Sequence, residues 1–221
     1  VEEALRIAEA HGGNEEGGAN TVTVISMGPE RATEAARKAL SMGANDAILI
    51  SDPVLAGADA VVTAEVLANV ILKGEFDIVI CGTESTDARM SVVPAMMSEK
   101  LGCAQLTFAS KVSVDPGAKK VSITRVTEAG VDEVHGEFPC VISVVEKINE
   151  PRYPSFKGIM AAKKKVIDVR DFASTGAQFT KSWSAVVDSA PRPPRAGGVV
   201  VTDDGTAGQK LVDFLSEKKL I

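Results

Sequence analysis

The stretch TVTVISMGPERATEAARKALSMG, residues 21–43, carries the pattern on which the fold assignment depends. Thr21–Ser26 is rich in β-branched residues and predicts a short strand. A Met-Gly-Pro turn follows, and Pro29 is placed to open a helix that Gly43 ends. The expected buried face of this helix consists of Ala32, Ala35, Ala36, Ala39 and Leu40. A buried strand followed by an amphipathic helix is the repeating unit of a parallel α/β sheet.

The same alternation continues along the chain. Further strands are predicted at Asp46–Ile50 and Phe76–Cys81, with a helix between them from Asp59 to Lys73. Another helix runs through Met96, Met97 and Leu101, and Gly102 ends it. These elements predict an α/β fold with a doubly wound, mostly parallel, Rossmann-like sheet.

After Gln105 the pattern changes to alternating polar and apolar residues. Lys111–Val114 and Val121–Val126 flank an Asp-Pro-Gly turn signal, and Val131–Val134 alternates in the same way before Cys140–Glu146. We therefore expect antiparallel strands added to the parallel core.

The last fifty residues lack this periodicity. Ser174–Gly198 is rich in Ser, Ala, Pro and Gly and predicts an extended arm, followed by a final amphipathic helix. The apolar side of that helix carries Leu211, Phe214, Leu215 and Leu220. We expect an α/β domain over 1–170 and an arm with a terminal helix over 171–221. That helix packs either on another chain or back on its own domain.

Composition narrows the function classes. A net charge of −6 and a pI near 5.1 over 221 residues argue against nucleic-acid binding. No apolar run approaches the roughly 20 residues that span a bilayer. Three scattered cysteines and two histidines predict no metal site, no disulfide framework and no catalytic residues, and no nucleophile–base pair is visible. Phosphate-binding glycine motifs such as GxxxxGK[ST] and GxGxxG are absent from the sequence.

One polar stretch, GTESTDARMS at 82–91, follows a buried strand and precedes a helix. Gly82 lets the backbone approach a ligand, hydroxyl groups line the stretch, and the helix N-terminus after Ser91 favours an anion. These features are consistent with nucleotide binding at the carboxyl end of a strand. The alternative is ordinary helix capping, with Glu84 or Asp87 accepting hydrogen bonds from amides of the loop itself.

A second unusual segment, NEPRYPSFKGIMAAKKK at 149–165, follows the buried strand CVISVVE. Pro151 and Pro154 restrict its backbone, which lowers the entropy lost when such a segment docks on a partner. Phe156 lies where no periodicity buries it, as an interface anchor does, although it could instead pack on the base of the segment. Lys163–Lys165 predict either a solvated strand edge or a patch that steers an acidic partner.

Several motifs together resemble the electron transfer flavoprotein β-subunit family. They are NEPRYPSFKGIMAA (149–162) with the three lysines after it, VICGTESTD (79–87), GPERATEAARKALSMGAN (28–45) and QLTFASKV (105–112). The resemblance runs along essentially the whole chain, in the order that the family shows. Because VEEALRIAE at 1–9 resembles the first helix of the family, we expect the sequence to be a fragment lacking the first strand and an adenine-contacting loop.

The resemblance implies a function that composition does not show. Family members pair with an α-subunit, and the heterodimer holds one FAD, mostly in the α-subunit. The β-subunit binds AMP and docks acyl-CoA and related dehydrogenases, as in fatty acid β-oxidation. Electrons then pass to a membrane quinone oxidoreductase. The family expectation is an electron carrier rather than an enzyme, cytoplasmic in bacteria or in the mitochondrial matrix of eukaryotes.

The resemblance also implies site residues. The implied AMP contacts are Met27, in the turn after the strand at 21–26, and Gly82, Thr83, Glu84, Ser85, Thr86, Asp87, Ala88, Arg89, Met90, Ser91, Val92 and Val93. The implied partner recognition loop consists of Tyr153, Pro154, Ser155, Phe156, Lys157, Gly158, Ile159, Met160 and Ala161. Phe156 occupies the position of the family's apolar anchor.

The sequence departs from the family at two places. Ala88–Ser91 stand where members keep glycines, and this change is expected to restrict positive φ angles in the phosphate-facing part of the loop. Val126 replaces the acidic residue that follows the arginine at 125. Two other functions stay open: a bifurcating flavoprotein subunit with a second FAD in place of AMP, and a free-standing adenine-nucleotide-binding module.

Overall fold

The computed structural model describes residues 1–15, 17–178, 181–195, 197–198 and 200–221. It divides the chain into two compact units, Val1–Ala185 and Val186–Ile221. The predicted arm, 171–221, includes positions outside the described residues.

One sheet of the first unit, sheet A, is entirely parallel. Its strands are β1 (Thr23–Met27), β2 (Asp46–Ile50) and β8 (Asp168–Arg170), in the order β1-β2-β8. Met27, predicted to lie in a turn, is the last residue of β1 and aligns with Ile50 of β2.

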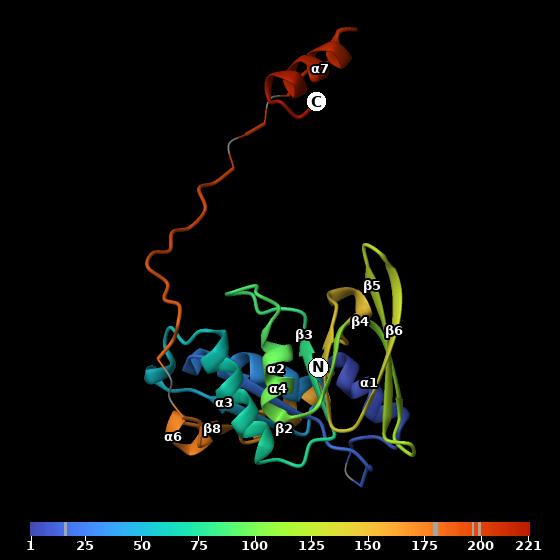
Figure 1. The fold of residues 1–221 in the computed structure, drawn as a ribbon, viewed down its shortest axis with the longest axis vertical. Coiled ribbons are helices and arrows are strands. Elements are labelled where there is room, and N and C mark those ends of the chain that lie inside the picture. Colours follow the sequence, from blue (N-terminus) through green and yellow to red (C-terminus); the bar gives the residue numbers. More distant parts are fainter. Residues whose placement is uncertain (16, 179–180, 196, 199) are drawn as a thin grey trace. The chain divides into compact units, whose positions relative to one another are not determined.

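The second sheet, sheet B, is mixed. Its order is β3 (Ile78–Gly82), β7 (Cys140–Val144), β4 (Ala104–Asp115), β5 (Lys120–Thr127) and β6 (Gly130–Glu137). The first three strands run parallel to one another, whereas β5 and β6 are antiparallel neighbours (Figure 1). The predicted α/β class and the added antiparallel strands are confirmed. Among the described strands, no hydrogen-bonded pair connects β1 to β3, so the parallel strands form two sheets.

The helices of the first unit connect these strands. They are α1 (Glu2–Ala10), α2 (Thr33–Met42), α3 (Ala60–Leu72), α4 (Val93–Leu101), α5 (Phe156–Lys164) and α6 (Phe172–Thr175), with 3-10 turns at Glu30–Ala32, Pro53–Leu55 and Glu146–Ile148. Gly43 and Gly102 end α2 and α4 as predicted, and the Asp59 carboxylate caps α3 by accepting a 3.0 Å hydrogen bond from the Val62 amide. In the described part of the chain, no helix is long and apolar enough to cross a membrane.

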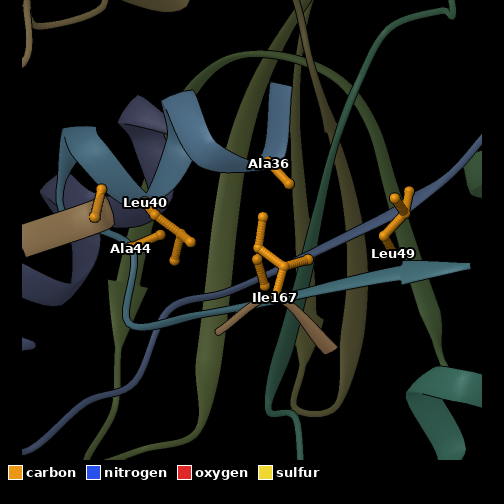
Figure 2. Packing of buried hydrophobic residues seen from close by; sticks show 7 residues of the cluster. Ala36, Leu40, Ala44, Leu49 and Ile167 are labelled. Atoms are coloured by element: carbon orange, nitrogen blue, oxygen red, sulfur yellow. The ribbon is translucent and has the colours of Figure 1, made fainter. Parts of the chain in front are cut away.

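The core beside α2 joins this helix to sheet A. Ala36 and Leu40 of α2 pack with Ala44, Leu49 and Ile167, and Figure 2 shows these side chains converging between the helix and the strands. Of the predicted helix face, Ala36, Ala39 and Leu40 are buried and Ala32 is half-buried. Ala35 is exposed, contrary to prediction, because it lies at the margin of the face that Ala36, Ala39 and Leu40 define at helical spacing.

Strand β4 changes its hydrogen-bonding partner near Phe108. Ala104–Leu106 pair with β7, Lys111–Asp115 pair with β5, and Ala109 pairs with both, with a register irregularity on each side of Ala109. Phe108 has a φ of 61°, and its amide donates a 2.9 Å hydrogen bond to the Ser143 hydroxyl. A Cβ on Gly136 of β6 would lie 2.9 Å from Leu106 Cδ1. The antiparallel strands therefore pack closely over the first half of β4.

Candidate functional site

The polar loop after β3 starts at the carboxyl end of two parallel strands. Gly82 of β3 lies opposite Val144 of β7, and Thr83 Oγ1 donates a 2.9 Å hydrogen bond to the Val144 carbonyl. This bond holds the first residues of the loop against the neighbouring strand. The loop, residues 82–93, thus begins at the edge where open α/β sheets bind ligands.

The Asp87 carboxylate organises the middle of the 82–93 loop. Its Oδ1 accepts hydrogen bonds from the Ser85 hydroxyl and, at 2.7 Å, from the Ala88 amide. The Ser85 hydrogen bond, and after it the Ala88 amide, holds the pKa of Asp87 below its ordinary value. The interpretation that a loop carboxylate accepts hydrogen bonds from the loop itself is confirmed for Asp87. Glu84 has a different role and accepts a 3.4 Å hydrogen bond from the Ser91 hydroxyl.

The backbone of the loop follows a path that glycine favours. Arg89 has a φ of 51° and Ser91 a φ of 58°, both in the left-handed region. The left-handed conformation costs a residue other than glycine about 1–2 kcal/mol of conformational free energy. The substitutions at Ala88–Ser91 were expected to restrict such angles, yet two of these residues adopt them. The loop keeps a glycine-like conformation at a cost in strain.

The start of α4 differs from the prediction. We expected the helix N-terminus directly after Ser91, but α4 begins at Val93, and its N-cap residue, Val92, makes no side-chain capping hydrogen bond. Pro94 in the first turn has no amide hydrogen to offer. This helix end therefore presents fewer donors to an anion than the sequence suggested.

The structure places the remaining predicted nucleotide contacts as follows. Thr86, Asp87, Arg89 and Met90 are exposed, whereas Ser91, Val92 and Val93 are half-buried. Met27 lies at the carboxyl end of β1 and packs beside the cluster that contains Ile50. Met27 and the 82–93 loop therefore both lie at carboxyl ends of parallel strands, but in two different sheets.

The 149–165 segment is partly helical, which the sequence interpretation missed. Phe156–Lys164 form α5, and the Ser155 hydroxyl caps it by accepting a 3.0 Å hydrogen bond from the Gly158 amide. Two sequence signals could have revealed this helix: a serine at the N-cap position, and lysines in the last turn. Residues 149–154 form neither a helix nor a strand.

Apolar side chains of this segment point into solvent. Phe156 is 80% exposed and Tyr153 is 96% exposed, and Ile159 and Met160 are also exposed. Phe156, Ile159 and Met160 share one helix face because residues three and four apart are neighbours on a helix. We call Tyr153, Phe156, Ile159 and Met160 the apolar α5 face. Phe156 does not pack on the base of the segment.

The opposite side of α5 is tightly attached to α2. A Cβ on Gly158 would lie 2.5 Å from the Ser41 carbonyl oxygen, so the two helices approach at a position that only glycine allows. Arg37 Nη1 donates a 2.6 Å hydrogen bond to the Ala162 carbonyl. Lys165 Nζ donates 2.8 Å hydrogen bonds to the carbonyls of Ala44 and Asn45, so this lysine is structural. Lys163 and Lys164 are exposed.

The extended start of the segment is attached to α1, through a residue that the sequence analysis did not single out. Arg152 forms ion pairs with Glu2 and Glu9, which precede it by about 150 positions, and Asn149 Nδ2 donates a 2.7 Å hydrogen bond to Glu3 Oε2. No local pattern signals such distant partners.

The structure also contains a serine–histidine pair that the sequence did not reveal. Ser122 Oγ lies 2.8 Å from His135 Nδ1 across β5 and β6, where His135 is exposed. A cavity of about 490 Å³ lies elsewhere, near the amino ends of β3 and β7, and includes Phe76 and Phe138 but neither member of the pair. The pair is a cross-strand contact on a solvated sheet face.

The second unit contains one helix, α7 (Ala207–Glu217), in its described residues. Leu211, Phe214 and Leu220 of the predicted apolar side are exposed, and Leu215 is half-buried. None of the residues of α7 is buried. This helix has an apolar face that its own unit does not cover.

Comparison with known proteins gives a consistent result. The model of the electron transfer flavoprotein domain matches residues 1–175. The electron transfer flavoprotein subunit beta of Mycobacterium tuberculosis (strain H37Rv) is 45% identical over 228 residues, with 100% of this chain and 84% of the relative covered.

Two more distant relatives cover the same share of each chain. The subunit beta of Thermoanaerobacterium thermosaccharolyticum is 36% identical over 229 residues. The caffeyl-CoA reductase-Etf complex subunit CarD of Acetobacterium woodii is 31% identical over 230 residues. For both, 100% of this chain and 84% of the relative are covered.

Proposed function

The chain belongs to the electron transfer flavoprotein family as a β-subunit, and from this premise we propose that it forms an electron-carrying heterodimer with an α-subunit. The heterodimer holds FAD, mostly in the α-subunit. It accepts electrons from acyl-CoA-type dehydrogenases and passes them to a membrane quinone oxidoreductase. The β-subunit contributes AMP binding and the surface that docks the dehydrogenase.

The observation that carries this proposal is the apolar α5 face. It exposes Tyr153 and Phe156 almost fully, while the side of α5 around Gly158 and Ala162 is attached to α2. Exposed aromatic side chains on a rigid support are the usual anchors of protein interfaces. A rigid support also reduces the ordering cost of association. We therefore assign dehydrogenase docking to the predicted loop Tyr153–Ala161.

The test is Phe156→Ala in the flavin-loaded heterodimer. Loss of a central aromatic anchor costs about 2 kcal/mol or more of binding, so the KM of a partner dehydrogenase for the heterodimer should rise about 30-fold. Heterodimer assembly and flavin content should stay unchanged. Val166→Ala is the matched control, because Val166 is 87% exposed but lies outside the apolar α5 face. An unchanged KM for Phe156→Ala would remove the docking role.

AMP binding is proposed for the 82–93 loop. The exposed Thr86 hydroxyl and the exposed Arg89 side chain supply hydrogen-bond donors and one positive charge. The left-handed backbone at Arg89 and Ser91 keeps the chain path that glycines would permit near a phosphate. Arg89 would provide a charge-assisted contact in place of the amides that Pro94 and the late start of α4 remove.

Nucleotide and flavin released from denatured heterodimer would test this assignment. We expect one AMP and one FAD per wild-type heterodimer, and less AMP after Arg89→Ala but not after Arg31→Ala, which alters an exposed arginine outside the loop. Two FAD and no AMP would favour the alternative of a bifurcating flavoprotein subunit with a second FAD in place of AMP. The similarity to a subunit of the caffeyl-CoA reductase-Etf complex is the reason to test it. One FAD and no AMP would exclude both.

The second unit is proposed to bind the α-subunit. The uncovered face of α7, with Leu211 and Phe214, is the apolar surface that a partner chain would bury. A free-standing nucleotide-binding module has no use for such a helix. Deleting residues after Ala185 removes this unit without touching α6, whose Phe172 packs in the core of the first unit. The truncated chain should lose its α-subunit, and equal co-purification would reject the assignment.

We propose no catalytic residues in this chain. Burial raises the pKa of the Cys81 and Cys140 thiols to about 11, so neither is a thiolate nucleophile near neutral pH. The Ser122–His135 pair lies on an exposed sheet face, outside the cavity near Phe76. The redox chemistry is that of the flavin.

A further inference from the structure

An ionic cluster between α1 and the 149–165 segment has no role in the function proposed so far. We propose that Arg152 is a positioning residue for the apolar α5 face. It ties residues 149–154 to α1 and thereby sets the place at which Tyr153 and Phe156 meet a dehydrogenase. This inference rests on the proposed docking role, and the experiment below separates the two.

The geometry of the cluster is specific. Arg152 Nε donates a 2.8 Å hydrogen bond to Glu2 Oε2, and Nη2 donates a 3.0 Å hydrogen bond to Glu2 Oε1. On the other side of the guanidinium, Nη2 donates to Glu9 Oε2 at 3.0 Å and Nη1 donates to Glu9 Oε1. The Arg152 amide also donates to Glu2 Oε2 at 3.0 Å. Bidentate pairing to two carboxylates fixes the orientation of the arginine as well as its position.

The burial of the cluster favours positioning over stability as its main effect. The Glu2 carboxylate is only 7% exposed, and Arg6 Nε donates a further hydrogen bond to it at 3.2 Å. Removing charges from water costs free energy that the ion pair largely returns, so the pair as a whole contributes little net stability, although removing one partner leaves the other buried and destabilises the fold. Its hydrogen bonds nevertheless permit one arrangement of the two elements. A lysine could not reproduce this arrangement, because it lacks the planar fork.

The residues beside Arg152 connect the ionic cluster to the apolar α5 face. Arg152 lies between Pro151 and Pro154 and next to Tyr153, which is 96% exposed. Prolines restrict the backbone, so few conformations separate the fixed arginine from the α5 cap at Ser155. Asn149 adds a second attachment to α1 through Glu3. Both ends of the segment are thus held, by α1 before Phe156 and by α2 after it.

The experiment uses the flavin-loaded heterodimer and measures kcat and KM for its reduction by an acyl-CoA dehydrogenase. Arg152→Gln should raise KM about tenfold, equivalent to about 1.4 kcal/mol of docking free energy, and leave kcat unchanged. Lys100→Gln is the matched control. It breaks an ion pair with Glu65 between α3 and α4, and Lys100 is 31% exposed, against 33% for Arg152. The control should change neither constant.

A double-mutant cycle supplies a readout that general destabilisation would not move. If Arg152 acts through Phe156, then Arg152→Gln in the Phe156→Ala background should raise KM less than about threefold. Glu9→Gln provides a milder variant, since Glu9 is 44% exposed and its loss leaves the Arg152–Glu2 pair intact. It should raise KM about threefold, and hydrogen exchange should quicken in residues 153–158 while β2 and β7 stay protected.

The outcomes separate the two ideas. Unchanged KM for Phe156→Ala would reject the docking role and, with it, this inference. A raised KM for Phe156→Ala alone, with Arg152→Gln and Glu9→Gln like wild type, would overturn only the positioning role. Fully additive effects in the cycle would also overturn it, because Arg152 would then act independently of Phe156. If Arg152→Gln does not fold, the KM of Glu9→Gln is compared with that of Lys100→Gln instead. A KM raised only in Glu9→Gln supports the positioning role, and equal KM values overturn it.

Discussion

The 82–93 loop and the 149–165 segment both follow strands of sheet B, but different parts of the molecule hold them. Beyond Thr83, which is bonded to Val144 of β7, hydrogen bonds among Ser85, Asp87 and Ala88 stabilise the middle of the loop locally. The segment depends on α1 and α2, whose contacts reach it over more than 110 positions. A locally held loop can adjust to a small ligand without disturbing the fold. A segment attached to two helices presents a fixed surface, which is what a large protein partner requires.

The attachment of α5 to α2 can be broken with a single methyl group. Alanine normally stabilises a helix interior relative to glycine, but Gly158→Ala places a Cβ 2.5 Å from the Ser41 carbonyl oxygen. Backbone cannot yield as a side chain does, so we expect a loss of about 1–3 kcal/mol in the free energy of unfolding. Urea denaturation measures it. Gly208→Ala in α7 is the control, because its Cβ meets nothing within 4 Å and should cause no loss. Equal behaviour of the two variants would contradict the close approach.

The loop should respond more weakly and more locally. Asp87→Ala removes the acceptor of two hydrogen bonds on an exposed loop, at a cost of about 0.5–1 kcal/mol. Hydrogen exchange should quicken at Ala88 and Arg89 only. Faster exchange in α5 as well would show that the two regions are not independent.

Protonation of Asp87 at low pH should weaken the same hydrogen bonds that Asp87→Ala removes. Hydrogen bonds from Ser85 and Ala88 lower the pKa of Asp87, so its contribution is complete above the ordinary aspartate pKa, about 3.9. The contribution is lost as pH falls through the lowered pKa. The Ala88 amide resonance should therefore titrate below about pH 4, and in Asp87→Asn this titration should disappear.

The smallest effect is expected from relief of strain in the loop. Ser91 has a φ of 58°, and replacing it with glycine relieves about 1 kcal/mol of strain in the folded state. Glycine also raises the conformational entropy of the unfolded chain, which lowers the stability by a similar amount. The free energy of unfolding, obtained from urea denaturation, should change by less than about 0.5 kcal/mol. Ala88→Gly is the contrast, since Ala88 is not in the left-handed region and glycine there should only destabilise. A loss for Ser91→Gly as large as that for Ala88→Gly would mean that the strain is not relieved.

Local sequence signals predicted most of the fold. β-branched strands, the apolar stripe of Asp59–Lys73 and the glycine ends at Gly43 and Gly102 correctly located α2, α3, the end of α4 and the strands beside them. The failures occurred where tertiary contacts decide. Ala35 has the residue type of a core position but lies at the margin of the buried face. Helix α5 was missed because two prolines and a glycine suggested a loop, whereas contacts with α2 stabilise the helix.

The candidate sites divide in the same way. The Asp87 hydrogen bond lies within one loop and could be anticipated from residue type. Left-handed backbone at Arg89 could not, because arginine rarely adopts it and only the surrounding chain imposes it. The partners of Arg152 lie at the other end of the chain, so only the folded structure brings them together.

The packing of α3 has a consequence for cooperativity. Ile25 of β1 and Leu67 of α3 pack against two core clusters. One contains Ile50 of sheet A, and the other contains Val141 of sheet B. Two sheets that share core side chains cannot melt separately without exposing those side chains to water, so the first unit should unfold in one transition. A ligand that binds the loop on sheet B then stabilises α5 beside sheet A by mass action, with no change in shape. Any ligand bound at the loop would thus raise the free energy of unfolding of the whole first unit, α5 included.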